Sequence, residues 1–165
     1  CNVMFSYCQS ILFDGESRLA TEEKGPECNY CVDITKSFIR KKVKDITIVG
    51  FGPSINDILD MSKQLENEHN INAEVLDLRT LNPLDEKTIL QSLKKTKRLA
   101  VVEYGWPRCS ISSEIISIVT KKMNLKSKPL AFNWPNNHVT TTENLAQQFY
   151  FLNKSALDKI IKLFK

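Results

Sequence analysis

DITIVGFGPS, residues 45–54, is the stretch of sequence that decides the fold. Its β-branched run Ile46–Val49 is typical of a buried strand, and the glycines and proline after it predict a tight turn. Ser54 is then placed to cap a helix. The apolar residues that follow it keep helical spacing at Ile55, Ile58, Leu59, Met61 and Leu65. A strand that turns directly into an amphipathic helix is the repeating unit of an α/β fold.

The same alternation continues to the end of the chain. Further strands are predicted at 73–78, 99–102 and 130–132. Helices are predicted after Pro83 and Asp85, at 111–119, and at 157–164 behind Ser155. Strands that alternate with helices in this way imply a parallel sheet with right-handed crossovers. We therefore predict that residues 45–165 form a three-layer α/β domain with a mostly parallel sheet.

Residues 1–44 have a different pattern. A short strand is predicted at Val3–Tyr7, and a second at Lys36–Ile39, before a basic turn. Between them the sequence is rich in charged and turn-forming residues, which is typical of a linker. The sequence begins at Cys1 and enters an apolar run at once, so we expect it to be a piece of a longer protein.

Composition limits the classes of function. The 42% apolar and 25% charged residues are those of a soluble globular protein. The net charge of +4 is mild and its cations are dispersed, so we expect no nucleic-acid binding. No apolar run approaches the roughly 20 residues of a membrane span, and we expect no membrane contact. Five cysteines, an odd number, favour a reducing compartment.

The glycine turn invites comparison with dinucleotide-binding sites, because Gly50 and Gly52 end a strand and Asp77 ends the next one. The third glycine of that fingerprint would fall at position 55, which is Ile55, and Pro53 removes a backbone N–H from the turn. A structural turn is the favoured interpretation. A stand-alone nucleotide-binding module stays as the alternative.

Two other kinds of site are weakly indicated. Cys28 and Cys31 form one C-x-x-C pair, and with Cys1 and Cys8 they could complete a zinc site, although unrelated cysteines are the simpler interpretation. The histidines are His69 and His138, and neither has a recognisable nucleophile beside it in the sequence. The sequence therefore argues against an enzyme that acts on its own.

More information comes from residues placed just after predicted strands. Arg79 follows the strand 73–78, and Asp85 opens the next helix. Glu103 ends the strand 99–102, and Trp106 follows in a Gly-Trp-Pro turn. The carboxyl ends of parallel strands host ligands or partners, and an exposed tryptophan there often anchors an interface. We interpret these residues as interface candidates, although each could equally serve its own domain.

Three motifs occur together in one register: EVLDLRTLNPLD at 74–85, VEYGWP at 102–107 and SEI at 113–115. In order and spacing they resemble the transketolase C-terminal domain family, and specifically the beta subunits of pyruvate dehydrogenase. The Gly-Trp-Pro turn leans toward these and away from branched-chain 2-oxo acid enzymes. The motif at 113–115 adds Glu114 to the interface candidates. The resemblance is weaker at 14–33, which looks like an insertion, and at 133–140.

The resemblance implies a role within a larger enzyme. Such enzymes oxidatively decarboxylate pyruvate with thiamine diphosphate and magnesium, which lie between an alpha subunit and a preceding pyrimidine-binding domain of the beta subunit. Residues 1–44 would contain the end of that domain. Residues 45–165 would support the contact with a second beta subunit and help to dock the dihydrolipoyl acyltransferase core, in an enzyme that also contains the alpha subunit. They would bind no cofactor and carry no catalytic residue. The implied location is a mitochondrial or plastid matrix, or the cytoplasm of a bacterium.

Overall fold

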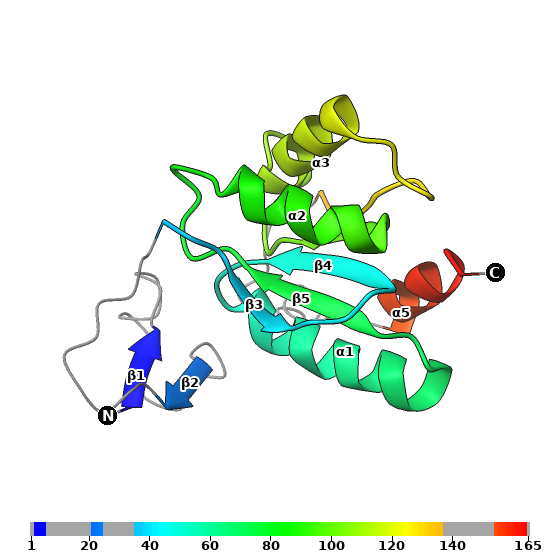
Figure 1. Ribbon diagram of the computed structural model, residues 1–165, viewed down its shortest axis with the longest axis horizontal. Helices are drawn as coiled ribbons and strands as arrows, with labels where there is room; N and C mark the ends of the chain where they lie inside the picture. The colour runs from blue at the N-terminus through cyan, green and yellow to red at the C-terminus, as the bar shows by residue number, and fades with distance from the viewer. Residues whose placement is uncertain (1, 6–20, 25–34, 137–153, 165) are drawn as a thin grey trace.

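The computed structural model describes residues 2–5, 21–24, 35–136 and 154–164, with side chains for 35–136 and 156–164 (Figure 1). The strands are β1 (Asn2–Phe5), β2 (Thr21–Lys24), β3 (Phe38–Lys41), β4 (Ile46–Gly50), β5 (Ala73–Asp77), β6 (Leu99–Val102) and β7 (Leu130–Phe132). The helices are α1 (Ser54–His69), α2 (Glu86–Thr96), α3 (Ile111–Lys122) and α5 (Lys154–Ile161). From β4 to β7 the elements follow the predicted alternation.

Five strands form the main sheet in the order β3-β5-β4-β6-β7. β4 pairs in parallel with β5 and β6, and β6 pairs in parallel with β7. β3 is the exception, since it pairs antiparallel with β5 at the edge of the sheet. β1 and β2 form a separate two-stranded antiparallel sheet. The predicted mostly parallel α/β fold is confirmed.

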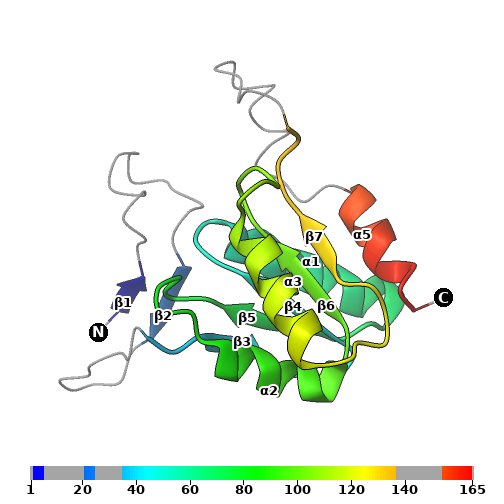
Figure 2. The same ribbon diagram turned by 90° about the horizontal axis from the view of Figure 1, so that it is seen from above.

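Helices cover the two faces of the sheet in pairs. α2 and α3 lie on one face, and α1 and α5 lie on the other (Figures 1 and 2). Alternate residues of β4 belong to different cores: Ile46 and Ile48 pack with α1 and α5, while Val49 packs with α2 and α3. All five residues of β4 are buried, as its β-branched sequence predicts for a strand covered on both faces.

The turn between β4 and α1 has a structural role. A Cβ at Gly50 would collide with Cδ1 of the buried Ile58 and lie 3.0 Å from the hydroxyl of Ser54, so glycine lets helix and strand approach without displacing Ile58. Gly52 has a φ of +59°, which also favours glycine. The prediction that Ser54 caps α1 through its side chain is wrong. Its hydroxyl instead donates to the carbonyl of Phe51 at 2.8 Å and holds the turn together.

β3 is attached to the sheet by more than its backbone. The register shifts between Ile39 and Lys41, so Arg40 occupies a bulge. The bulge lets the guanidinium of Arg40 reach Oδ2 of Asp77 at 2.9 Å, and both side chains are almost fully buried. β3 lies before residue 45, where we predicted the second domain to begin, yet it belongs to the main sheet. The division into 1–44 and 45–165 stays a prediction.

A buried polar network joins the centre of the sheet to α2. Glu74 of β5 is fully buried and accepts hydrogen bonds from the hydroxyl of Ser92 and from Nζ of Lys95, at 2.9 Å for the nearer oxygen. Thr47 of β4 lies 2.7 Å from the Ser92 hydroxyl and 2.8 Å from that of Thr96. Because the Ser92 proton points to Glu74, Thr47 donates to Ser92 and Thr96 donates to Thr47. These bonds fix α2 over β4 and β5.

Two expectations concern residues outside those that the structure describes. The candidate zinc ligands Cys1, Cys8, Cys28 and Cys31 lie outside the described residues, and so does His138. The zinc site therefore stays a prediction.

No helix within the described ranges has the length and apolar character needed to cross a membrane.

Replacing Lys95 tests the network at Glu74. We expect Lys95→Met to lower the free energy of unfolding by about 1–3 kcal/mol, because it leaves a buried carboxylate without its cation. The neighbouring Lys94→Met, which removes an exposed lysine with no ion pair among the described residues, should change stability by less than about 0.5 kcal/mol. Urea unfolding followed by circular dichroism measures both. Equal effects of the two variants would contradict the proposed role of Glu74.

Candidate functional site

The predicted site residues all lie where the parallel strands end. Arg79 follows β5, Asp85 precedes α2, Glu103 and Trp106 follow β6, and Glu114 lies in the first turn of α3. Since β5 and β6 flank β4 on opposite sides, these residues form two groups. Arg79 and Asp85 contact the start of β3, whereas the other three lie around the start of α3.

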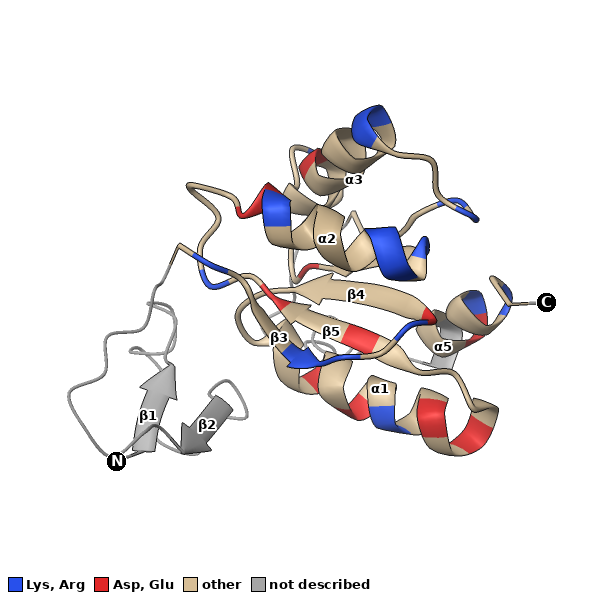
Figure 3. Ribbon diagram, viewed as in Figure 1, with Lys and Arg blue, Asp and Glu red and all other residues tan. Residues whose placement is uncertain are grey.

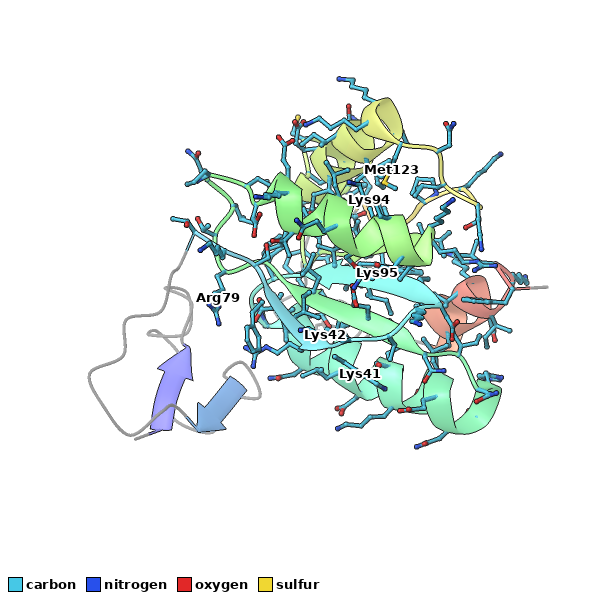
Figure 4. The ribbon with its side chains drawn as sticks, viewed as in Figure 1. Lys41, Lys42, Arg79, Lys94, Lys95 and Met123 are labelled. Carbon is cyan, nitrogen blue, oxygen red and sulfur yellow. The ribbon has the colours of Figure 1, made fainter. Side chains whose placement is uncertain are left out.

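Arg79 lies against its own domain. Its guanidinium carbon is 4.7 Å from the centre of the Phe38 ring, and that of Arg40 is 5.1 Å from the same ring. Figure 4 shows Arg79 beside β3, and the side chain is half-buried. These cation–π contacts stabilise the edge strand. Phe38 was not singled out in the sequence, because only the antiparallel pairing of β3 with β5 brings it next to Arg79.

Asp85 is the cap of α2 and also a link to β3. Its Oδ1 accepts from the backbone N–H of Thr88 at 3.1 Å, and its Oδ2 accepts from the N–H of Ser37 at 2.8 Å. Burial alone would raise the pKa of Asp85, but the hydrogen bonds from Thr88 and Ser37 outweigh it and the pKa is lowered. The carboxylate therefore holds the first turn of α2 and the chain before β3 together.

Glu103 performs a comparable task for α3. Its Oε2 accepts from the N–H of Ser112 at 2.9 Å, and its Oε1 accepts from the N–H of Ile111 at 3.4 Å. The amide of Asn133 adds a longer contact at 3.4 Å. A carboxylate is favoured at the amino end of a helix, where backbone donors are unsatisfied and the dipole is positive. Glu103 thus ties the end of β6 to α3.

Trp106 is different because half of its surface, 49%, is exposed. It packs edge-on against Trp134 with ring centres 6.2 Å apart, and Trp134 stacks on Tyr104 at 6.5 Å. The hydroxyl of Tyr104 donates to Asp57 of α1, and the backbone N–H of Trp134 donates to the carbonyl of Gly105 at 2.9 Å. We call Tyr104, Trp106 and Trp134 the aromatic cluster. It holds Trp106 in place while leaving it open to a partner.

The remaining candidate, Glu114, is exposed on α3. Leu81, which the sequence did not single out, is exposed in the loop after β5. Among the described residues, Leu81 and Trp106 are the exposed large apolar side chains, and both lie at the carboxyl edge of the sheet. Apolar exposure on this edge is the feature that fits an interface.

The alternative of a nucleotide site does not fit this edge. Asp77, the residue placed to bind a ribose, is buried and engaged by Arg40. Gly50 serves the packing of α1, as described above. Within residues 35–136 and 156–164, no three side chains of histidine, cysteine, aspartate or glutamate gather to hold a metal ion.

The lowered pKa of Asp85 predicts a pH dependence. We expect Asp85→Ala to lower the free energy of unfolding at neutral pH by about 1 kcal/mol through loss of the cap. A depressed pKa stabilises the fold above the ordinary value of about 3.9 and loses that contribution as the pH falls through the folded-state pKa. The difference between wild type and variant should therefore shrink in acid. Urea titrations across pH measure it, with the exposed Asp60→Ala as the control; a constant difference would contradict the assignment.

The capping role of Glu103 can be separated from general effects of charge. Glu103→Ala should destabilise the domain by about 1 kcal/mol, because the first backbone donors of α3 lose their acceptor. Glu114→Ala removes the same charge from an exposed site on the same helix and should cost a few tenths of a kcal/mol, roughly the dipole contribution. Thermal or urea unfolding compares the two. A loss at Glu114 as large as that at Glu103 would rule out the capping role.

Comparison with known proteins assigns the family. The model of the transketolase C-terminal domain matches residues 36–156. The beta subunit of acetoin:2,6-dichlorophenolindophenol oxidoreductase from Bacillus subtilis is 39% identical over 113 residues, which is 67% of this chain and 33% of that protein. The mitochondrial beta subunit of the pyruvate dehydrogenase E1 component from Dictyostelium discoideum is 38% identical over 109 residues, 66% of this chain and 30% of that protein. The chain therefore spans about a third of the length of these relatives.

A solved structure shares the fold. A split-gene transketolase, described as an inactive beta4 tetramer, superposes with a TM-score of 0.66 at 20% identity, over 83% of this chain and 46% of its own. The family match begins two residues before β3, in agreement with the place of that strand in the main sheet. The resemblance found in the sequence is confirmed, and the chain belongs to the transketolase C-terminal domain family.

Proposed function

We propose that this chain is the C-terminal part of the beta subunit of a thiamine-diphosphate-dependent 2-oxo acid dehydrogenase that acts on pyruvate. Within it, the domain organises the assembly and does not itself react with substrate. The relatives named pyruvate dehydrogenase E1 beta subunit, including one from Rickettsia conorii at 44% identity over 84 residues, support this proposal. The intact enzyme would oxidatively decarboxylate pyruvate and pass acetyl groups on toward acetyl-CoA.

The single observation that carries the organising role is the half-exposed Trp106. A tryptophan that is fixed by neighbouring rings loses little entropy when a partner covers it, and it buries a large area. The exposed Leu81 lies on the same edge of the sheet. We infer that this edge contacts another subunit, either the alpha subunit or a second beta subunit. The acyltransferase core is a further partner that we propose on the family resemblance alone.

Within this proposal, some candidate residues stabilise the domain and others are exposed to a partner. Arg79, Asp85 and Glu103 hold β3, α2 and α3 in place, so they shape the edge from within the domain. Trp106 and Glu114 are the exposed members, available to a partner. Thiamine diphosphate and magnesium would be held upstream, in the pyrimidine-binding domain whose end we place in residues 1–44.

A second candidate function comes from the acetoin relative. At 39% identity over 113 residues, the Bacillus subtilis oxidoreductase subunit is about as similar to this chain as the Dictyostelium discoideum pyruvate dehydrogenase subunit, at 38% over 109 residues. An acetoin oxidoreductase would use the same kind of organising domain. In this proposal the substrate is selected by residues outside this domain. Both enzymes would therefore use the same interface at the carboxyl edge, and only an assay with each substrate distinguishes them. A branched-chain 2-oxo acid is the third substrate to test.

The compartment follows from the proposed enzyme. Relatives named mitochondrial occur in Dictyostelium discoideum and Arabidopsis thaliana, and other relatives are bacterial. We propose a matrix location in a eukaryote, mitochondrial or plastid, or the cytoplasm in a bacterium.

The test is reconstitution of the full-length beta subunit with the alpha subunit from the same genome. The assembled enzyme should decarboxylate pyruvate in the presence of thiamine diphosphate and magnesium, and should do so faster than it consumes acetoin or a branched-chain 2-oxo acid. Preference for acetoin would replace the first proposal by the second. Failure to act on any of the three would refute both.

The same assembly tests the organising edge. Trp106→Ala should weaken subunit association by about 2 kcal/mol or more, the usual loss at an aromatic hot spot, while Trp106→Phe should recover part of it. Sedimentation or mass photometry measures the association, and circular dichroism checks that each variant folds. Gln64→Ala, an exposed site on α1, is the control. Unchanged assembly of a folded Trp106→Ala variant would exclude this edge as the interface.

A further inference from the structure

A second surface lies at the end of the sheet where the parallel strands begin, opposite to their carboxyl ends. This surface is strongly basic. α2 and α3 both end there, next to the starts of β6 and β7. We define the basic edge by five exposed lysines: Lys94, Lys97, Lys121, Lys126 and Lys128. Figure 3 shows cations in blue at the end of α2, at the end of α3 and in the loop that leads to β7. The net charge of the whole chain, +4, conceals this concentration.

The lysines come from segments that the fold brings together. The N–H of Lys126 donates to the carbonyl of Lys97 at 2.8 Å, so the loop before β7 lies against the end of α2. The helices α2 and α3 contact each other, and Figure 4 labels Lys94 on α2 and Met123 at the end of α3. Neither 87–102 nor 115–132 contains an acidic residue. Like charges are therefore gathered without acids interspersed among them.

The carboxylates that pair with lysines near the ends of α2 and α3 use lysines outside the basic edge, and Asp45, just before β4, accepts hydrogen bonds from Asn72. Buried Glu74 binds Lys95, and Glu86 binds Lys122. Across the part of the chain that the structure describes, none of the five lysines of the basic edge is within ion-pair distance of a carboxylate. The charge of this edge is thus not neutralised within the domain.

Helix dipoles account for only part of the pattern. Lys94 and Lys121 lie in the last turns of α2 and α3, where a cation is favoured. Lys126 and Lys128 lie in a loop, which offers no such stabilisation, and Lys97 caps α2 through its backbone. Repulsion between these lysines is relieved when an external anion approaches.

We propose that the basic edge docks an acidic segment of a partner protein, rich in aspartate and glutamate. The chemistry of the surface favours this partner over others. Its cations are lysines, which act as point charges, and the exposed large apolar residues of the described chain, Leu81 and Trp106, lie at the other edge. Among the residues that the structure describes, the basic edge has no exposed aromatic ring on which a nucleic-acid base could stack and no exposed large apolar side chain that could enter a membrane.

This surface is distinct from the aromatic cluster at the carboxyl edge. The proposal does not depend on the reaction of the intact enzyme, and it would hold for any member of the family with the same charges. It predicts an interaction that is fast, weak at high salt and specific for negative charge.

The experiment measures fluorescence anisotropy of a labelled peptide of alternating glutamate and glycine on the 165-residue chain. The peptide should bind at low ionic strength and dissociate as salt is raised. The double variant Lys94→Glu, Lys126→Glu should weaken binding about tenfold or more. Its control is Lys63→Glu, Lys87→Glu, which changes the net charge equally at exposed sites on α1 and at the start of α2. The control should bind like the wild type.

Competing partners are separate arms of the same experiment. A single-stranded DNA of matched charge and vesicles containing phosphatidylserine are titrated under the same conditions, and circular dichroism verifies that both double variants fold. Because reversal at Lys94 could disturb α2, Lys126→Gln with Lys128→Gln, which alters only the loop, is measured as well and should also weaken binding. No binding of the peptide, equal loss in the control, or tighter binding of DNA or vesicles would each overturn the proposal. None of these outcomes bears on whether the assembled enzyme decarboxylates pyruvate.

Discussion

The complete burial of β4 is the constraint on which the rest of the domain depends. β5 and β6 pair with its two edges, and helices cover both of its faces, so every neighbour must approach closely. At Gly50, where α1 returns over the strand, a side chain would displace Ile58 of that helix. On the other face, Thr47 joins the hydroxyl chain that leads to Glu74 and fixes α2. One strand thereby positions helices on both faces, and through them the loops that carry the candidate site.

Much of this arrangement follows from local sequence. The β-branched run at β4, the proline and aspartate before α2, and the glycine turns predict strands and helices close to those observed, because each signal acts over a few residues. The contacts that the sequence does not reveal all join distant residues. Phe38 meets Arg79 only because β3 pairs antiparallel with β5, and Glu74 meets Lys95 only because α2 crosses that strand. Local signals can also mislead, as Ser54 shows. A serine at the start of a helix can form a hydrogen bond with the preceding turn as readily as with the helix.

For the candidate site, the sequence predicts where the residues lie in the fold better than it predicts which contacts their side chains make. Residues just after parallel strands do gather at one edge, as topology requires. Yet the carboxylates of Asp85 and Glu103 accept hydrogen bonds from backbone N–H groups of their own domain. The guanidinium of Arg79 makes a cation–π contact with a neighbouring ring. Only solvent exposure distinguishes Trp106 from them, and exposure depends on the packing of Trp134, more than 20 residues further along the chain. The type and spacing of these residues therefore could not show which of them stabilise their own domain and which are exposed to a partner.

The bulge in β3 has a consequence for the behaviour of the protein in solution. A regular edge strand offers a row of free backbone groups to any other extended chain, and that is how sheets of separate molecules fuse into aggregates. Here the irregular register at Arg40 and the neighbouring lysines break up such a row. At the other end of the sheet, β7 is only three residues long and gives an incoming strand little to hold. Both edge strands of the main sheet are therefore poor templates for pairing with the sheet of another copy of the domain.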